Sequence, residues 1–469
     1  MERVPDGYVL TKKEEYELLL SLSMQVPGLQ ARVAELEGLL SKKSGNSSKP
    51  PSSDGLSKPA PRTRKPSGRK KGGQPGHKGS TLSASATPDM VVELGPDFCP
   101  DCGEALDSEL EVMESRQVMD IPPPPKLVVT EYRVGFKVCS GCGKLCWGDF
   151  PEAVRGTVQY GPNLAAEVVY LHSYHMLPVR RICESICHRY GSMISDATVL
   201  AMVGQASAKL EGFIEHVREL LIASKITHFD ETGMRVAGSL HWFHNASTKL
   251  LTLLFAHKNR GLIAMEAMGV LPTFKGVAVH DRWKSYMLYL DCLHAFCNAH
   301  ILRDLEFLHE QKGQAWAAEM TDALMNAKRA SEGESPPSAE QVIQLTDRYL
   351  QIVEQALENC PPDPIPTGKR GRKKKSEARN LLEMLKENKD EVLRFLTDPE
   401  VPFDNNQAER DVRMAKVKMK VSGCFRTFEG ADNFANIRSY ISTVKKHARD
   451  ILQDLASAMK GDPFMPNMA

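Results

Sequence analysis

The chain carries an acidic pair in a setting that suits metal binding or general-base chemistry. The stretch 226–236, ITHFDETGMRV, predicts a short strand of β-branched and apolar residues that delivers Asp230 and Glu231 at its end, with Gly233 as a breaker. A carboxylate at a strand end, beside a turn, is accessible to a cation or a substrate. Acidic residues before a glycine also form ordinary turns, so this stretch alone leaves both interpretations open.

Two more acidic residues have similar settings further along the chain. An apolar run, VAVH, is followed by Asp281, and the segment 404–420 predicts a helix capped by Asp404 or Asn405, with Glu409 in its second turn. Two strand-end aspartates and a helical glutamate can converge as an all-oxygen site for two hard divalent cations. Such a site requires the two strands to be neighbours and the helix to pack beside them.

The elements between these acids have an order that allows convergence. After the strand with Asp230, the pattern predicts strands at 240–246 and 250–257, a helix at 259–269, the strand before Asp281, a strand at 293–298 and a helix at 299–310. This order is typical of an RNase H-like sheet, in which the first and fourth strands are neighbours. A CxxH pair after the last strand, Cys297 and His300, either helps to position the active site or has a structural part.

Several long motifs closely resemble those of the insertion sequence 66 family of transposases, which are DDE enzymes. They are, in chain order, DETGMRVAGSLHWFHNAST, GVAVHDRWKSY, CNAHILRDL, NNQAERDVR and SGCFRTFEGADNFANIRSYIST. The resemblance runs from about residue 46 to the C-terminus. By position, it implies that Asp230, Asp281 and Glu409 are the catalytic triad and that Lys416 is the basic residue that accompanies the glutamate in many DDE enzymes.

The resemblance implies a DNA transposase that cleaves the 3′ ends of an insertion sequence and joins them to target DNA. Three converging carboxylates are ionised at neutral pH and repel one another, so two Mg²⁺ (or Mn²⁺) ions are expected as cofactors. The expected partners are double-stranded DNA (transposon ends and target), further copies of the chain, as a homodimer or a higher oligomer in the synaptic complex, and companion transposition proteins. A metal-dependent nuclease without strand transfer and a non-catalytic zinc-containing DNA-binding protein are the alternatives.

Two CxxC pairs predict a structural zinc site. Each pair is followed by a glycine that frees the turn, and the four ligands are Cys99, Cys102, Cys139 and Cys142. Four thiolates close a tetrahedral site and leave no position for a substrate, so one structural Zn²⁺ is expected. A redox pair and chance spacing are the alternatives.

Composition is that of a globular protein of a reducing compartment. The chain has 469 residues, room for roughly two to four domains, a net charge of +1, and no apolar run near the ~18 residues of a membrane helix. The polar N-terminus predicts no signal peptide, and the cysteines outside the CxxC pairs are scattered. We expect a cytoplasmic, nucleoid-associated bacterial protein with no membrane partner.

The N-terminal part carries a helical pattern and then a basic linker. A seam in steps of four and three predicts either a coiled coil for dimerisation or an ordinary amphipathic helix, and comprises Leu22, Val26, Leu29, Val33, Leu36 and Leu40. Between 55 and 79 the chain has basic residues and no acid. Contact with DNA phosphates is expected here, a solvated linker being the alternative, through Arg62, Arg64, Lys65, Arg69, Lys70, Lys71 and Lys78.

Helical patterns flank the expected core. Residues 156–222 predict either a helix-turn-helix, with Thr198 near the start of its second helix, or a bundle that packs on the core. A helical insertion is expected at 313–400, with a basic block at 369–375 that contacts DNA or is solvated. An amphipathic helix is expected at 433–458. Its basic residues, which face DNA or solvent, are Arg438, Lys445 and Lys446.

The fold expected is a multidomain α+β protein with an RNase H-like α/β catalytic core and a helical insertion. An N-terminal helix, a basic linker and a four-cysteine zinc-binding domain precede the core. The expected segments are an N-terminal helix or coiled coil at 1–45, the linker at 46–88, the zinc-binding domain at 89–155, the helical and candidate DNA-binding segment at 156–222, the first part of the core at 223–312, the insertion at 313–400, and C-terminal core helices with the catalytic glutamate at 401–469.

Overall fold

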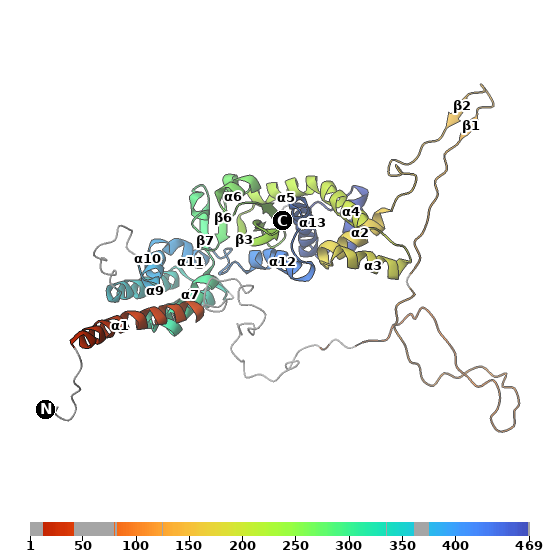
Figure 1. Cartoon of the computed structure of the whole chain (residues 1–469). Coiled ribbons are helices and arrows are strands. Elements are labelled where there is room, and N and C mark those ends of the chain that lie inside the picture. Colours follow the sequence, from red (N-terminus) through yellow and green to blue (C-terminus); the bar gives the residue numbers. More distant parts are fainter. Residues whose placement is uncertain are drawn as a thin grey trace.

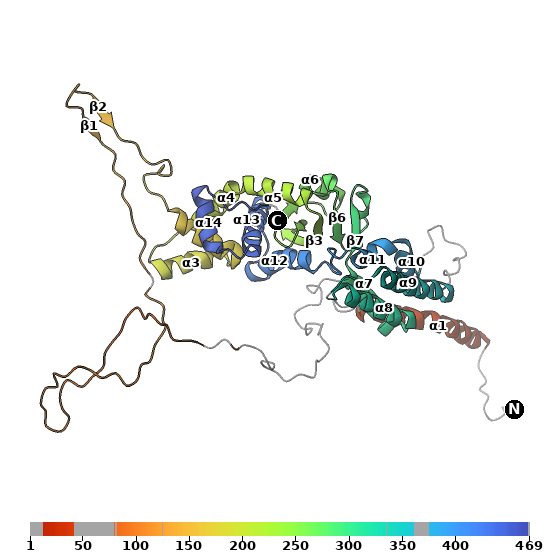
Figure 2. The ribbon, with the colours of Figure 1, turned by 180° about the vertical axis from the view of Figure 1, so that it is seen from behind.

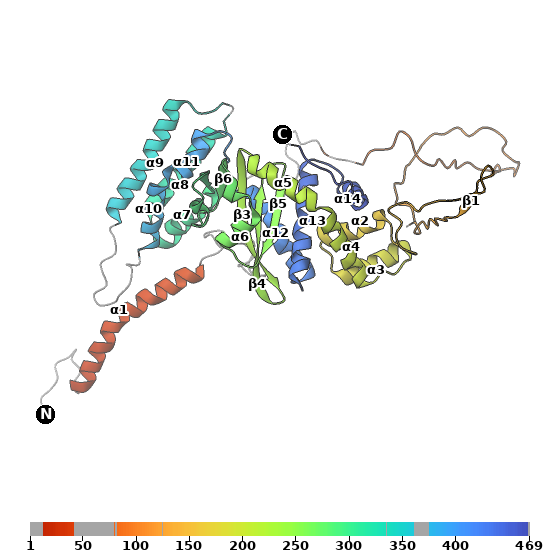
Figure 3. The same ribbon diagram turned by 90° about the horizontal axis from the view of Figure 1, so that it is seen from above.

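The computed structural model describes residues 13–41, 79, 82–123, 125–333, 335–360 and 375–467. A central sheet has helices on both faces and a further group of helices at each end, and a long arm extends from one of these groups (Figures 1 and 3). The mixture of helices and sheet agrees with the predicted α+β class. Among the described residues, every helix is too short or too polar to span a bilayer.

The sheet has five strands in the order β5-β4-β3-β6-β7. The strands, all built on β-branched or apolar residues, are β3 (Ile226–Val236), β4 (Ser239–Ser247), β5 (Thr252–His257), β6 (Val277–His280) and β7 (Leu293–Phe296). The first three form an antiparallel meander, whereas β6 is parallel to β3 and β7 is parallel to β6. The prediction that the first and fourth strands are neighbours is therefore confirmed.

Strand β3 is longer than the sequence predicted. It does not end at Glu231, and Gly233 is not a breaker, because Gly233 pairs with Trp242 inside the antiparallel ladder. The turn comes at Ala237 and Gly238, whose φ angles of 47° and 82° place both in the left-handed region. A glycine does take part in the turn after the strand, but it is Gly238 and not Gly233.

Helices cover the two faces of the sheet with different partners. On one face, α12 (Asn406–Ser422) and α13 (Phe428–Lys446) enclose a core with Met234 of β3 and Phe243 of β4. On the other face, α5 (Glu211–Ala223) and α6 (Leu262–Met268) enclose Phe229. Figures 1 and 2 show α5 and α6 across the sheet from α12. Because side chains alternate along a strand, Asp230 lies on the α12 side.

A helical group packs at the β7 edge of the sheet. It comprises α7 (Asn298–Lys312), α8 (Ala315–Ser331), α9 (Ala339–Asn359), α10 (Glu377–Glu387) and α11 (Lys389–Thr397). Its core continues into the sheet through Val279 and Phe296. The segment predicted as a helical insertion is thus helical, and a loop precedes α9, whose start is fixed by a capping box between Ser338 and Gln341. Residues 361–374 of this segment lie outside the described residues.

A second helical group packs at the other end. It comprises α2 (Pro162–Val169), a π-helical turn (Tyr170–Tyr174), α3 (Val179–Tyr190), α4 (Asp196–Lys209) and α14 (Ile451–Lys460). Thr198 lies near the start of α4, as the sequence predicted, and Ser195 caps this helix by accepting a hydrogen bond from the Thr198 amide. The single helix predicted at 433–458 is wrong. Ala448 has a φ of 54° between α13 and α14, and Asp450 caps α14.

Two further elements stand apart from the core. Helix α1 (Lys13–Ser41) is continuous through Pro27, although a proline inside a helix removes one backbone hydrogen bond. The arm carries a hairpin of β1 (Phe136–Val138) and β2 (Leu145–Trp147), which pair antiparallel (Figure 1).

Candidate active site

Asp230 and Asp281 come together because of the register between β3 and β6. The parallel pairing runs from Ile226 opposite Val277 to His228 opposite Val279. Asp230 lies two residues beyond the last pair, and Asp281 follows directly after β6, so both carboxylates lie where the pairing ends. The Asp281 carboxylate accepts a hydrogen bond from the Trp283 amide at 2.9 Å, which fixes the turn after the strand.

Glu409 reaches the same region from α12. The helix begins after Asn405, so Glu409 is in the first turn. The sequence predicted the second turn, which is wrong. Asn405 itself is buried, and it ties the start of the helix to β3. Its Nδ2 donates to the Phe229 carbonyl at 2.7 Å, and its Oδ1 accepts from the His228 ring at 2.8 Å. The sequence analysis considered Asn405 only as a helix cap and missed this tether.

Burial and neighbouring charges raise the pKa of all three acids. Burial is the largest cause for Asp230, whose pKa lies well above its usual value, and the negative charges of Glu231, Asp281 and Glu409 add to it. Burial also raises the pKa of Asp281 and of Glu409, and the charge of Asp281 adds to the latter. The charges of Asp281 and Glu409 thus act on Asp230, and we call these three residues the acidic cluster. Their ligand oxygens do not all lie within 4.8 Å of one another among the described residues.

The donor set of this cluster fits a hard divalent cation. All of its donor atoms are carboxylate oxygens, the ligands that Mg²⁺ and Mn²⁺ prefer. The Glu409 Oε1 atom is buried and has no hydrogen-bond partner. A cation would remove both the repulsion among the acids and this unsatisfied acceptor.

Glu231 is the neighbour of Asp230 in sequence but has a different environment. Its carboxylate accepts hydrogen bonds from Arg260 at 2.6 and 2.9 Å and from the Tyr286 hydroxyl at 2.5 Å. The Arg260 guanidinium lies over the rings of Trp242 and Trp283, 5.0 and 4.2 Å from their centroids. Sequence reasoning missed Arg260 and Tyr286 because no local pattern marks them; only the folded sheet brings them to Glu231.

Lys416 lies two turns after Glu409 and faces the same strand. Its ammonium group donates to the Gly233 carbonyl, and burial lowers its pKa. The side chain therefore links α12 to the middle of β3 in this structure. A contact between Lys416 and a DNA phosphate would require the ammonium group to release that carbonyl.

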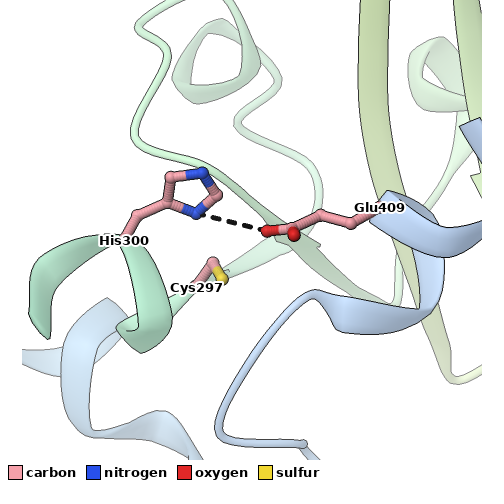
Figure 4. A group of neighbouring side chains, drawn as sticks. All are labelled: Cys297, His300 and Glu409. Carbon is pink, nitrogen blue, oxygen red and sulfur yellow. Dashed lines mark ion pairs between the residues drawn. The ribbon is translucent and has the colours of Figure 1, made fainter. Parts of the chain in front are cut away.

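The CxxH pair lies directly beside the acidic cluster. Cys297 precedes α7 and His300 is in its first turn, and both side chains point toward Glu409 (Figure 4). The Sγ, ring nitrogen and carboxylate oxygen of these three residues all lie within 4.8 Å of one another. Arg303 of the same helix lies 3.8 Å from the other Glu409 oxygen.

Each CxxC pair and the glycine after it form a tight turn, here called a zinc knuckle. The two knuckles are formed in the same way. The amides of Gly103 and Gly143 donate to the carbonyls of Cys99 and Cys139 at 2.9 and 2.8 Å, and both glycines have positive φ angles. Backbone hydrogen bonds within each turn lower the pKa of the Cys99 and Cys139 thiols. Preorganised thiols fit zinc. The two knuckles lie apart in this structure, since no three of the four sulfurs are within 4.8 Å of one another among the described residues.

The other predicted DNA contacts divide into two groups. Arg62, Arg64, Lys65, Arg69, Lys70, Lys71 and Lys78 lie outside the described residues, as does the block 369–375 except for its last lysine. The prediction for Arg438 and Lys446 is wrong, because both pack inside the core. Arg438 is 6% exposed, and Lys446 donates to two backbone carbonyls and to Asp411. Lys445 is exposed.

Sequence comparisons assign this site to a class. The transposase IS66 family matches residues 157–433, more than half of the chain, and the zinc-finger binding domain of transposase IS66 matches residues 96–143. A family of unknown function matches residues 5–83. No curated protein matches the chain.

The chain is therefore a DNA-binding, zinc-finger-containing transposase. More particularly, it belongs to the IS66 family of transposases. The predicted resemblance is confirmed, and the zinc-finger match includes both CxxC pairs.

Proposed function

We propose that this transposase cleaves the 3′ ends of an insertion sequence and joins them to target DNA at one acidic site formed by Asp230, Asp281 and Glu409. The observation that carries the proposal is the placement of these acids, two where the pairing of β3 with β6 ends and one in the first turn of α12, which Asn405 ties to β3. Buried like charges are costly unless a cation offsets them. A structural role would not require three of them together.

We also propose that the sheet is an RNase H-like core. The order β5-β4-β3-β6-β7, with three antiparallel strands followed by two parallel ones, supports this assignment. So does the arrival of the glutamate on a helix that packs against β3. The segment boundaries expected from the sequence, with the core at 223–312 and 401–469 and the insertion at 313–400, are part of the same proposal.

The roles of the chain's residues follow from their surroundings. Asp230, Asp281 and Glu409 would hold two Mg²⁺ or Mn²⁺ ions, which would activate the attacking oxygen and stabilise the leaving 3′ oxygen. Asn405 positions Glu409 by tying the start of α12 to β3. Arg260 is held between two tryptophans, partly exposed, and near enough to Asp281 to lower its pKa, so it can orient a phosphate at the site.

Other parts of the chain would bind DNA around this centre. The four cysteines of the two knuckles would hold one structural Zn²⁺, and the basic linker with Arg62, Arg64, Lys65, Arg69, Lys70, Lys71 and Lys78 would contact DNA phosphates. Lys416 would contact a phosphate near the cleaved bond. The partners proposed are transposon ends and target DNA, a second copy of the chain in the synapse, and companion transposition proteins, in the bacterial cytoplasm.

The experiment incubates the full chain with the native element ends, a target plasmid and Mg²⁺. Cleavage at the 3′ ends followed by joined product supports the transposase. Cleavage without joining would favour a nuclease with the same core, and DNA binding without either product would favour a non-catalytic protein. Omitting Mg²⁺ from a parallel sample shows whether the products need the divalent ion.

A further inference from the structure

A second donor cluster of different chemistry adjoins the acids. Cys297, His300 and Glu409 come from the start of α7 and the first turn of α12, and Figure 4 shows their side chains converging. Cys297 is fully buried, and His300 and Glu409 have side chains only 17% and 30% exposed. The cluster is thus enclosed and not a surface group of acids.

The geometry leaves a gap of the right size between two of these residues. His300 Nδ1 and Glu409 Oε1 face each other at 3.7 Å. Each is buried and has no hydrogen-bond partner. A direct N–H···O bond would close the distance to about 2.7–3.2 Å. Two ligands of one tetrahedral zinc ion stand roughly 3.3–3.5 Å apart, given bonds of about 2.0–2.1 Å. The observed separation is nearer to that of two ligands of a common ion.

The donor atoms select the class of cation. A thiolate sulfur and an imidazole nitrogen favour Zn²⁺ and similar transition metals, whereas Mg²⁺ takes oxygen ligands. The Cys297 sulfur accepts a hydrogen bond from the Asn405 amide at 3.1 Å, which holds the sulfur in place beside the other two donors. Binding would release the Cys297 thiol proton to solvent.

We propose that Cys297, His300 and Glu409 bind one Zn²⁺-class ion, which is distinct from the zinc-finger ion and adjoins the all-oxygen site. The fourth ligand position is left for water. Glu409 belongs to both clusters, so occupation of one site acts on the other through this carboxylate. Zinc binding by these three residues is expected whether or not the chain cleaves or joins DNA strands.

The test is the zinc content of the full chain, prepared with excess Zn²⁺ and then dialysed against millimolar Mg²⁺. Elemental analysis compares the wild type with Cys297→Ser, which keeps an acceptor for the Asn405 amide, and with His300→Gln. Cys292→Ser is the matched control, because Cys292 is a buried cysteine near the same strand but outside the cluster. Thermal unfolding of each protein verifies the fold.

The wild type and Cys292→Ser should each hold about one zinc ion more per chain than either cluster variant. Added Co²⁺ should give a thiolate-to-cobalt absorption band that Cys297→Ser lacks while its knuckles remain loaded with zinc. Equal zinc content in the wild type and in a folded Cys297→Ser or His300→Gln would overturn the proposal. These readouts need no DNA, so a protein that binds this zinc yet cleaves nothing would refute the proposed function alone.

Discussion

Adjacent acids in β3 differ in how their charges are balanced. Glu231 has an arginine and a tyrosine hydroxyl on its carboxylate, whereas Asp230 accepts one hydrogen bond from a backbone amide and lies among other negative charges. A buried charge without a counter-charge is a cost that folding alone does not explain. We therefore regard Glu231 as part of the scaffold and Asp230 as part of the reacting centre.

This imbalance predicts how stability depends on pH and on metal. A carboxyl whose pKa is raised by folding destabilises the folded state once the pH exceeds its unfolded value. The metal-free chain should thus lose stability as the pH rises from about 4 through the raised pKa values of Asp230, Asp281 and Glu409. Magnesium should restore it, by about 2.7 kcal/mol at a hundred times its Kd. Calorimetric melting with and without Mg²⁺ measures both effects.

Asp230→Asn should be more stable than the wild type at neutral pH without metal and should lose the response to Mg²⁺. Asp432→Asn is the control, because burial also raises the pKa of Asp432 but its carboxyl is on α13 and outside the acidic cluster. It should keep the full Mg²⁺ response. An Asp230→Asn protein that Mg²⁺ stabilises as strongly as the wild type would argue against a cation at this residue.

At the scale of elements, the sequence identified the strands and most helices that build the site. Apolar runs and their spacing predicted the five strands and the position of Asp281 because each strand's pattern is local. The end of β3 was misplaced because Gly233 is held inside the ladder by the partner strand, which a single segment does not reveal. The break between α13 and α14 was missed because Ala448, rather than a glycine, takes the left-handed conformation.

The residues that position the site could not be predicted from the sequence, for a related reason. Asn405 meets His228, 177 residues away, and Arg260 meets Glu231 across 29 residues. Such contacts depend on strand register and helix packing, which are set by the whole core. The acids, with their strand-end and helical contexts, and the CxxH pair Cys297 and His300 could be selected from the sequence because their patterns are local.

The Asn405 tether gives a prediction about α12. Asn405→Ala removes one donor and one acceptor from buried partners, so it should cost about 1–3 kcal/mol of stability and slow cleavage by shifting Glu409. Asn406→Ala, at an exposed position one residue on, should change stability by less than about 0.5 kcal/mol. Urea unfolding and a 3′-end cleavage assay measure the two effects. Equal behaviour of the two variants would show that α12 does not depend on this tether.

At the scale of the whole molecule, a nearly neutral chain concentrates positive charge in one N-terminal segment. The net charge is +1, yet residues 55–79 carry basic residues without any acid. The arm with the zinc knuckles and this linker both lie N-terminal to the helices that cover the sheet. We infer that DNA is held by these N-terminal parts while the sheet presents the acids.

The linker should therefore govern the salt dependence of DNA binding. Replacing the basic residues between 55 and 79 with glutamine should flatten the plot of log affinity against log salt by about 0.9 for each phosphate that the linker no longer neutralises. The matched control replaces Lys225 and Lys275, exposed lysines of the core, with glutamine, and should leave the slope almost unchanged. An unchanged slope in the linker variant would remove this segment from the DNA interface.

The most direct measurement is the rate of 3′-end cleavage by Asp230→Asn, Asp281→Asn and Glu409→Gln in Mg²⁺, beside the wild type and the exposed-loop control Asp291→Asn. Each of the three should cleave at least about a thousandfold more slowly, a loss of roughly 4 kcal/mol of transition-state stabilisation, with DNA affinity retained. The control should cleave at the wild-type rate. If any one of the three variants cleaves as fast as the control, the metal-binding acidic centre is assigned to the wrong residues.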